Sequence, residues 1–147
     1  MTDEHYMRMA LKEAEEALAQ GEVPIGAIVV CNDRIVGRGH NLVETLRDVT
    51  AHAEMQAITA ASDTLGGKYL TDCTLYVTVE PCAMCAAALG WAQIDRIVYG
   101  ASDEKRGYRR VYGNERAPLH PKTSILGGVL AEECGDLMTD FFKALRH

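Results

Sequence analysis

The chain has no long hydrophobic segment, no excess of positive charge and no repeat or low-complexity tract. Its 147 residues contain no apolar run near the roughly 20 residues of a membrane-spanning helix. The first residues are acidic, unlike the apolar core of a secretory signal. We therefore expect a cytoplasmic protein without a membrane span, folded as one domain over residues 1–147. The net charge of -6 does not by itself indicate a nucleic-acid partner.

A disulfide-built scaffold is also not expected, because the cysteine count of 5 is odd and two of the five are candidate metal ligands. Cys31 and Cys73 lie on strand-like segments, and Cys134 lies in a helical pattern. We expect these three to be buried as small apolar residues. Cys82 and Cys85 remain as a pair, with two residues between them and Pro81 directly before Cys82.

Those two cysteines follow a second polar motif, His52-Ala53-Glu54. One imidazole and two thiolates supply three zinc ligands, which leaves one tetrahedral position free for water. A carboxylate beside that water can move its protons. The pattern predicts a hydrolytic site with one zinc ion per subunit. A redox pair or half of a structural zinc knuckle is the alternative, and the knuckle needs a further Cys or His pair that the sequence lacks.

Both motifs are expected at helix starts. Pro81 suits the first turn of a helix over residues 81–91, and the positive end of that helix lowers thiol pKa values. His52 and Glu54 are expected in the first turn of another helix, where both reach one metal ion.

The remaining pattern predicts a layered α/β domain. Helices are expected at 3–20 and 130–145, and strands at 25–31, 34–40, 74–79, 96–99 and 123–126. Asn32-Asp33 indicates a two-residue hairpin, and the strand-helix-strand order over 74–99 indicates a parallel pair. Residues 102–122 are expected to be an irregular loop with room for a short helix.

This loop concentrates positive charge beside aromatic side chains. Its cations are Lys105, Arg106, Arg109, Arg110, Arg116 and Lys122, among Tyr108, Tyr112 and His120. Such a segment can contact phosphates and stack on splayed RNA bases. The alternative is a solvated loop whose cations pair with nearby acids.

The motif His52-x-Glu54 with Pro81-Cys82-x-x-Cys85 resembles the signature by which zinc-dependent nucleoside and nucleobase deaminases are known. Further segments resemble the bacterial tRNA-specific adenosine deaminases within that family. They are 22–27, 40–41, 50–54, 75–82 and 97–101. The resemblance implies a three-layer α/β/α cytidine-deaminase-like fold with a five-stranded mixed sheet. It also implies a homodimer that converts adenosine to inosine at the wobble position of a tRNA anticodon loop.

The same resemblance implies roles for individual residues. His52, Cys82 and Cys85 would hold zinc, zinc-activated water would attack C6 of adenine, and Glu54 would be the proton shuttle. Substrate-binding positions would be Asn41, Pro24, Ile25 and Ala53, with Asn41 hydrogen-bonded to the base. Lys105, Arg106, Arg109 and Arg110 are the expected nucleic-acid contacts. Without the resemblance, an asparagine after a strand is typical of a turn.

Two features leave alternatives open. The stretch Arg106-Gly107-Tyr108-Arg109-Arg110 differs from the small-residue Gly-Ala-x-Gly-Ser type found in many bacterial tRNA enzymes. A deaminase of free guanine, cytosine or a related nucleoside is therefore the second hypothesis, and a noncatalytic zinc or RNA-binding module is the third. The apolar helix around Leu89 and Trp91 suits either a core or a subunit contact.

Overall fold

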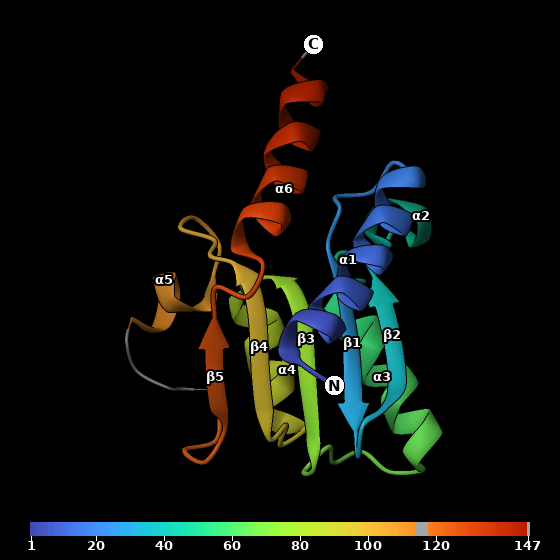
Figure 1. The fold of residues 1–147 in the computed structure, drawn as a ribbon, viewed down its shortest axis with the longest axis vertical. Coiled ribbons are helices and arrows are strands. Elements are labelled where there is room, and N and C mark those ends of the chain that lie inside the picture. Colours follow the sequence, from blue (N-terminus) through green and yellow to red (C-terminus); the bar gives the residue numbers. More distant parts are fainter. Residues whose placement is uncertain (114–117, 147) are drawn as a thin grey trace.

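Helices and strands alternate along the chain in the computed structural model, which describes residues 1–113 and 118–146 (Figure 1). In chain order they are α1 (Asp3–Ala19), β1 (Gly26–Cys31), β2 (Arg34–His40), α2 (Val43–Leu46), α3 (Ala53–Leu65), β3 (Cys73–Val79), α4 (Ala83–Trp91), β4 (Arg96–Ala101), α5 (Tyr108–Tyr112), β5 (Ser124–Gly127) and α6 (Ala131–Leu145).

The strands form one mixed sheet in the order β2-β1-β3-β4-β5. β1 is antiparallel to both β2 and β3, whereas β3, β4 and β5 are parallel to one another. The predicted five-stranded mixed sheet is therefore confirmed, including the parallel pair around α4. The start of β1 consequently lies beside the carboxyl end of β3, since Ala27 pairs with Val77.

Helices cover both faces of the sheet, which gives the predicted three layers (Figure 1). On one face, α3 and α4 pack through Ala57 and Leu89 against strand residues such as Leu75. On the other face, Met7 of α1 and Cys134 of α6 pack against Ile28 and other strand residues of the second cluster. Alternate residues of each strand thus enter opposite cores, as the two-residue period of a strand requires. The far end of α6 projects away from the sheet (Figure 1).

Most predicted elements are confirmed to within a few residues. The hairpin between β1 and β2 turns at Asn32 and Asp33, whose φ angles of 50° and 61° suit the tight turn predicted there. The start of α4 was predicted two residues too early. Pro81 lies before the N-cap Cys82 and so outside the helix. Its carbonyl accepts a hydrogen bond from the Tyr108 amide.

Glycines allow α3 to lie very close to β2. A Cβ atom added to Gly39 would overlap the Ala53 carbonyl, and one added to Gly37 would overlap the Ala57 carbonyl. Close packing of the first turn of α3 on the sheet places the residues before it, including His52, at the sheet edge. Within the described ranges, no helix has the length and apolar character that crossing a membrane requires.

Candidate metal centre

Two helix starts meet at the carboxyl end of β3. His52 is the N-cap of α3, and Cys82 is the N-cap of α4 three residues after β3 ends. Cys85 lies in the first turn of α4, on the buried side. The expectation that both motifs open helices is confirmed, with His52 one position earlier than the first turn. Both positive helix ends therefore face the same place, which favours anionic ligands there.

The three predicted ligands have the spacing of a zinc site. His52 Nδ1 lies 3.6 Å from Cys82 Sγ and 3.5 Å from Cys85 Sγ. All three ligand atoms lie within 4.8 Å of one another. Tetrahedral zinc with bonds of about 2.0 Å to nitrogen and about 2.3 Å to sulfur would separate those atoms by about 3.6 Å. The two nitrogen–sulfur distances therefore fit one zinc ion bound by all three residues.

The protonation of the thiols also favours a cation. A hydrogen bond from Cys85 lowers the pKa of Cys82 to about 4. The same contact, together with burial, raises the pKa of Cys85 far above its ordinary value. Without a metal ion, these opposite shifts favour one thiolate and one thiol, because two thiolates this close repel each other. A divalent ion removes that repulsion, so that both sulfurs bind as thiolates and release their protons.

Glu54 is a buried acid beside these ligands. Its side chain is within hydrogen-bonding reach of the Cys85 sulfur, and the residue is 4% exposed. Burial raises the pKa of Glu54 to about 7, while the charge of a bound cation would act in the opposite direction. A carboxyl group with a pKa in this range can both accept and return a proton near neutral pH.

The predicted substrate-binding residues lie on neighbouring segments of the same edge. The Asn41 amide donates to the Ile25 carbonyl over 3.1 Å, and the Leu42 amide donates to the Ala51 carbonyl over 2.9 Å. Asn41, Pro24 and Ala53 are buried and Ile25 is half-buried. Backbone hydrogen bonds thus link the segments that carry Ile25, Asn41 and His52.

Glu22 is a buried acid that holds this edge together, and sequence reasoning missed it. Its carboxylate accepts hydrogen bonds from the Glu44 amide at 3.1 Å and from the amide and hydroxyl of Thr45, both at 2.6 Å. Burial alone would raise the pKa of Glu22, but these hydrogen bonds hold it below its ordinary value. Glu22 therefore caps α2, directly after Asn41 and Leu42. The available sequence signal was the acidic Glu22 at the start of the otherwise apolar segment 22–27.

Residues 102–112, called the cationic loop below, lie against the segment 80–85 that carries Cys82 and Cys85. The segment 80–85 is called the metal segment below. Cys82 forms a β-bridge with Gly107, just before α5. Lys105, Arg106, Arg109 and Arg110 are all exposed, and the Arg109 guanidinium also pairs with buried Glu80 at 2.9 Å. The structure leaves RNA contact by these four residues untested. Arg116 lies outside the described residues.

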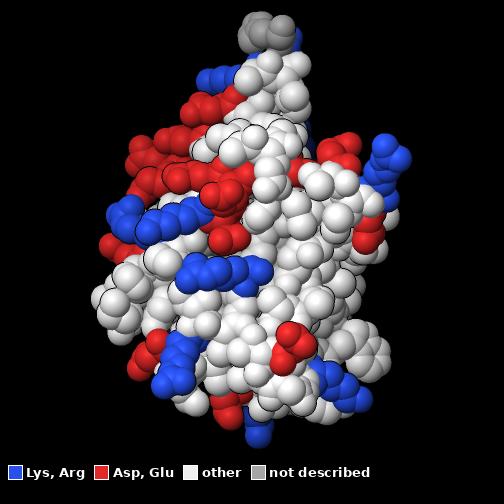
Figure 2. Space-filling model, turned by 90° about the vertical axis from the view of Figure 1, so that its right-hand side faces the viewer, with Lys and Arg blue, Asp and Glu red and all other residues white. Residues whose placement is uncertain are grey.

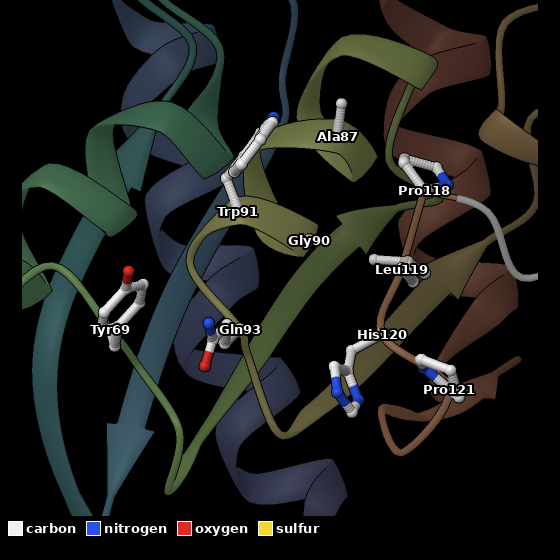
Figure 3. A pocket seen from close by; sticks show the side chains of 9 residues that line it. All are labelled: Tyr69, Ala87, Gly90, Trp91, Gln93, Pro118, Leu119, His120 and Pro121. Carbon is white, nitrogen blue, oxygen red and sulfur yellow. The ribbon is translucent and has the colours of Figure 1, made fainter.

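A hollow of about 490 Å³ lies away from the metal ligands, around the C-terminal end of α4 (Figure 3). Trp91, Gly90 and Ala87 line one side, and residues 118–121 line the other. Trp91 is 80% exposed, although Leu89 and Ala86 of the same helix are fully buried. The helix therefore contributes to the core and also presents an apolar surface.

The two strand cysteines are closer than expected from their isolation in the sequence. Cys31 and Cys73 are register partners across β1 and β3. Cys73 is buried as predicted, while Cys31 is half-buried. Cys134 is buried in α6, also as predicted.

Comparison with known proteins identifies the family. The model for the cytidine and deoxycytidylate deaminase zinc-binding region matches residues 1–101. The tRNA-specific adenosine deaminase of Bacillus subtilis (strain 168) is 44% identical over 146 residues, covering 98% of this chain and 91% of that protein.

Solved structures agree with this assignment. One from a study of A-to-I editing by tRNA:A34 deaminases at the wobble position has a TM-score of 0.83 and 40% identity, covering 90% of this chain and 98% of that chain. The guanine deaminase of Bacillus subtilis has a TM-score of 0.69 and 31% identity, covering 99% and 94%. With the ligand geometry above, these matches show that the chain belongs to the zinc-binding cytidine and deoxycytidylate deaminase family.

Proposed function

We propose that this protein hydrolyses adenosine to inosine and ammonia at the wobble position of a tRNA anticodon. The observation that carries the chemistry is the cluster of His52, Cys82 and Cys85 beside buried Glu54. The choice of substrate is supported by 44% identity to a tRNA-specific adenosine deaminase over nearly the whole chain.

The three metal ligands and Glu54 would have different roles in deamination. Zinc held by His52, Cys82 and Cys85 would polarise water and so supply a nucleophile at neutral pH. Glu54 would take up a proton from that water and pass protons to the adenine ring and to the departing amine. Burial raises the pKa of Glu54 and the charge of a bound cation would lower it, so the two effects oppose each other in a group that must both take up and release protons.

Asn41 is proposed to orient the base. Its Oδ1 atom accepts a hydrogen bond from the Val43 amide at 3.1 Å, so its NH₂ group is the donor available to a substrate. Pro24, Ile25 and Ala53 would form apolar walls around the ring. The cap that Glu22 provides for α2 keeps the Asn41 turn in place before substrate binds.

The cationic loop is the proposed contact for the anticodon loop. Lys105, Arg106 and Arg110 are exposed on the segment that touches Cys82 through Gly107. The face in Figure 2 is unsuited to this role, because acidic side chains gather over its upper half and cations are scattered. α5 lies on the left of Figure 1, the side turned away from the viewer in Figure 2. Local positive charge can thus guide RNA despite the net charge of -6.

A homodimer is proposed from the exposed face of α4. Trp91 and the neighbouring hollow present large apolar surfaces next to polar residues, as subunit contacts often do. Sedimentation velocity should then give about twice the mass of one chain, and Trp91→Glu should shift the protein toward monomer. A wild-type monomer at micromolar concentration would exclude the dimer.

We further propose that the protein works in the cytoplasm. Zinc binding requires Cys82 and Cys85 as free thiolates, and reduced thiols persist in reducing compartments. Fractionation of cells followed by detection of the protein would test this location directly.

Free guanine is the second candidate substrate, because the guanine deaminase of Bacillus subtilis shares 31% identity over 99% of this chain. Purified zinc-loaded protein should be incubated with an anticodon hairpin carrying adenosine at the wobble position. Parallel reactions contain the same hairpin with that adenosine moved to the stem, free guanine, cytosine, and adenosine. Inosine from the first RNA alone supports the proposal, whereas xanthine from guanine supports the alternative. Loss of every product despite bound zinc would indicate a noncatalytic module.

A further inference from the structure

Glu80 is a buried acid two residues before the metal ligand Cys82, and its side chain is 1% exposed. Its carboxylate accepts hydrogen bonds from the Asp103 amide at 3.1 Å and the Arg109 amide at 3.2 Å. Arg109 adds Nε at 3.2 Å and Nη2 at 2.9 Å. All four of these donors belong to residues 102–112, which follow β4 and end in α5.

The same loop is fixed to the metal segment by its backbone. The Tyr108 amide donates to the Pro81 carbonyl over 2.8 Å, and Gly107 forms the bridge with Cys82. A Cβ atom at Gly107 would overlap the Glu80 carboxylate. The Glu80 carboxylate therefore fills the space between the metal segment and the loop, and the absence of a side chain at Gly107 leaves room for it.

The contacts of Glu80 continue toward the exposed cations. Asp103, whose amide binds Glu80, accepts hydrogen bonds through Oδ1 from the Lys105 amide at 3.1 Å and the Arg106 amide at 3.0 Å. On the other side of Gly107, the Arg110 amide donates to the Gly107 carbonyl at 3.0 Å. Lys105, Arg106 and Arg110 thus stand on a backbone whose position is set by Glu80 and its partners.

Arginine suits this position because its planar guanidinium can bind both oxygens of one carboxylate. Arg109 also donates from Nη2 to Ser102 Oγ at 3.0 Å, and its Cζ lies 5.8 Å from the centre of the Tyr99 ring. A buried carboxylate without its cation is strongly unfavourable. It would also repel phosphate groups at the surface where RNA is expected.

We propose that Arg109 is a positioning residue, which through Glu80 holds the loop 102–112 against the metal segment and so places Lys105, Arg106 and Arg110 for the RNA backbone. This inference rests on the proposed RNA substrate. It replaces direct phosphate binding by Arg109 with an indirect effect on the other three cations. It also gives a reason for the departure of this stretch from small residues.

Arg109→Lys tests the proposal, because lysine keeps the charge that a phosphate contact needs but loses the paired hydrogen bonds to Glu80. We expect Arg109→Lys to raise KM for the anticodon hairpin by about tenfold and Arg109→Gln to raise it by at least as much, with kcat of both variants within about twofold of wild type. Zinc content and melting temperature of each variant should be recorded, so that loss of fold is separated from loss of position.

Glu80→Gln supplies the second arm. If Arg109 acts through Glu80, the KM effects of Glu80→Gln and Arg109→Gln are not additive in the double variant. If Glu80→Gln does not fold, the comparison of Arg109→Lys with Arg109→Gln still decides. Wild-type KM in Arg109→Lys, or additive effects in the double variant, would overturn the inference. A wild-type protein that makes no inosine from the hairpin would instead overturn the proposed function, before any variant is compared.

Discussion

His52 Nδ1 and Cys85 Sγ lie 3.5 Å apart, although 32 residues separate them in the chain. The separation matches two ligands of one tetrahedral zinc ion. It arises because α3 and α4 begin at the same sheet edge and pack on the same face. The metal site is therefore a property of the fold as well as of the motif.

Removal of one ligand should remove the metal. Cys85→Ser is expected to lower bound zinc from about one ion per chain to a small fraction, because a serine hydroxyl is a poor zinc ligand. Cys134→Ala is the matched control, since this buried thiol lies in α6 and is expected to leave zinc content unchanged. Metal analysis after dialysis measures both. Full zinc in Cys85→Ser would exclude Cys85 as a ligand.

Glu54→Gln should separate metal binding from chemistry. The substitution keeps the shape of a side chain that is not a ligand but removes its ability to transfer protons. We expect full zinc content and a decrease in kcat of at least about 10²-fold. Single-turnover assays on the hairpin, with zinc measured in the same samples, test this expectation. Wild-type turnover would refute the assigned role of Glu54.

The salt dependence of RNA use should report the cationic loop. Replacing Lys105, Arg106 and Arg110 by glutamine is expected to weaken RNA binding and to reduce the slope of log K against log salt by about 2, from three phosphate contacts. The control is a triple variant at Arg8, Lys12 and Lys143, which has the same net charge but loses its cations from α1 and α6. Equal slopes in both triple variants would remove the loop from the RNA surface.

The pH dependence of stability should reflect a contact between α1 and β4. Asp3 accepts hydrogen bonds from both terminal nitrogens of Arg96 and from the Tyr76 hydroxyl, each at 2.8 Å. The Arg96 hydrogen bonds lower the pKa of Asp3, although burial opposes them. The stabilisation is therefore present above the unfolded pKa of about 3.9 and is lost as pH falls through the lower folded value.

Asp3→Asn should accordingly reduce the free energy of unfolding by about 1 kcal/mol at pH 7 and by less as the pH falls below about 4. Urea unfolding of the wild type and of Asp3→Asn, at pH 7 and again below pH about 4, measures this loss of stability. Glu4→Gln removes an acid from the same helical turn and corrects for the effect of charge at the helix start. If the free energies of unfolding of the wild type and Asp3→Asn differed by the same amount at both pH values, the effect could not be assigned to ionisation of Asp3.

Close packing of α3 on β2 should be sensitive to one methyl group. Gly39→Ala would place a Cβ atom on the Ala53 carbonyl, so we expect a loss of about 1–3 kcal/mol in stability and lower activity from displaced His52. Gly67→Ala is the control, since a Cβ atom there meets no neighbour within 4 Å. Equal stability of the two variants would show that the sheet and helix can separate without cost.

Local patterns in the sequence predicted much of this structure. Helix and strand periodicity located the main elements, and the residue types around His52 and Cys82 predicted the metal ligands. The contact between Glu80 and Arg109 was not predictable in this way, because it joins the residue after β3 to α5, which follows β4 in the chain. The pairing of Cys31 with Cys73 was missed for the same reason, since it depends on the register of two strands that are distant in sequence.

The interpretation of Arg109 shows a second limit of sequence reasoning. A run of cations indicates a phosphate surface, but it does not show which of them is already paired within the fold. The structure provides that information, because 56% of the Arg109 side chain is covered and its guanidinium faces a buried carboxylate.

X-ray absorption at the zinc edge, on protein purified without added metal, tests the central claim most directly. The account predicts one nitrogen and two sulfur scatterers at about 2.0 and 2.3 Å, with one further light atom completing four-fold coordination. Four sulfur scatterers, or no zinc bound to folded protein, would contradict it.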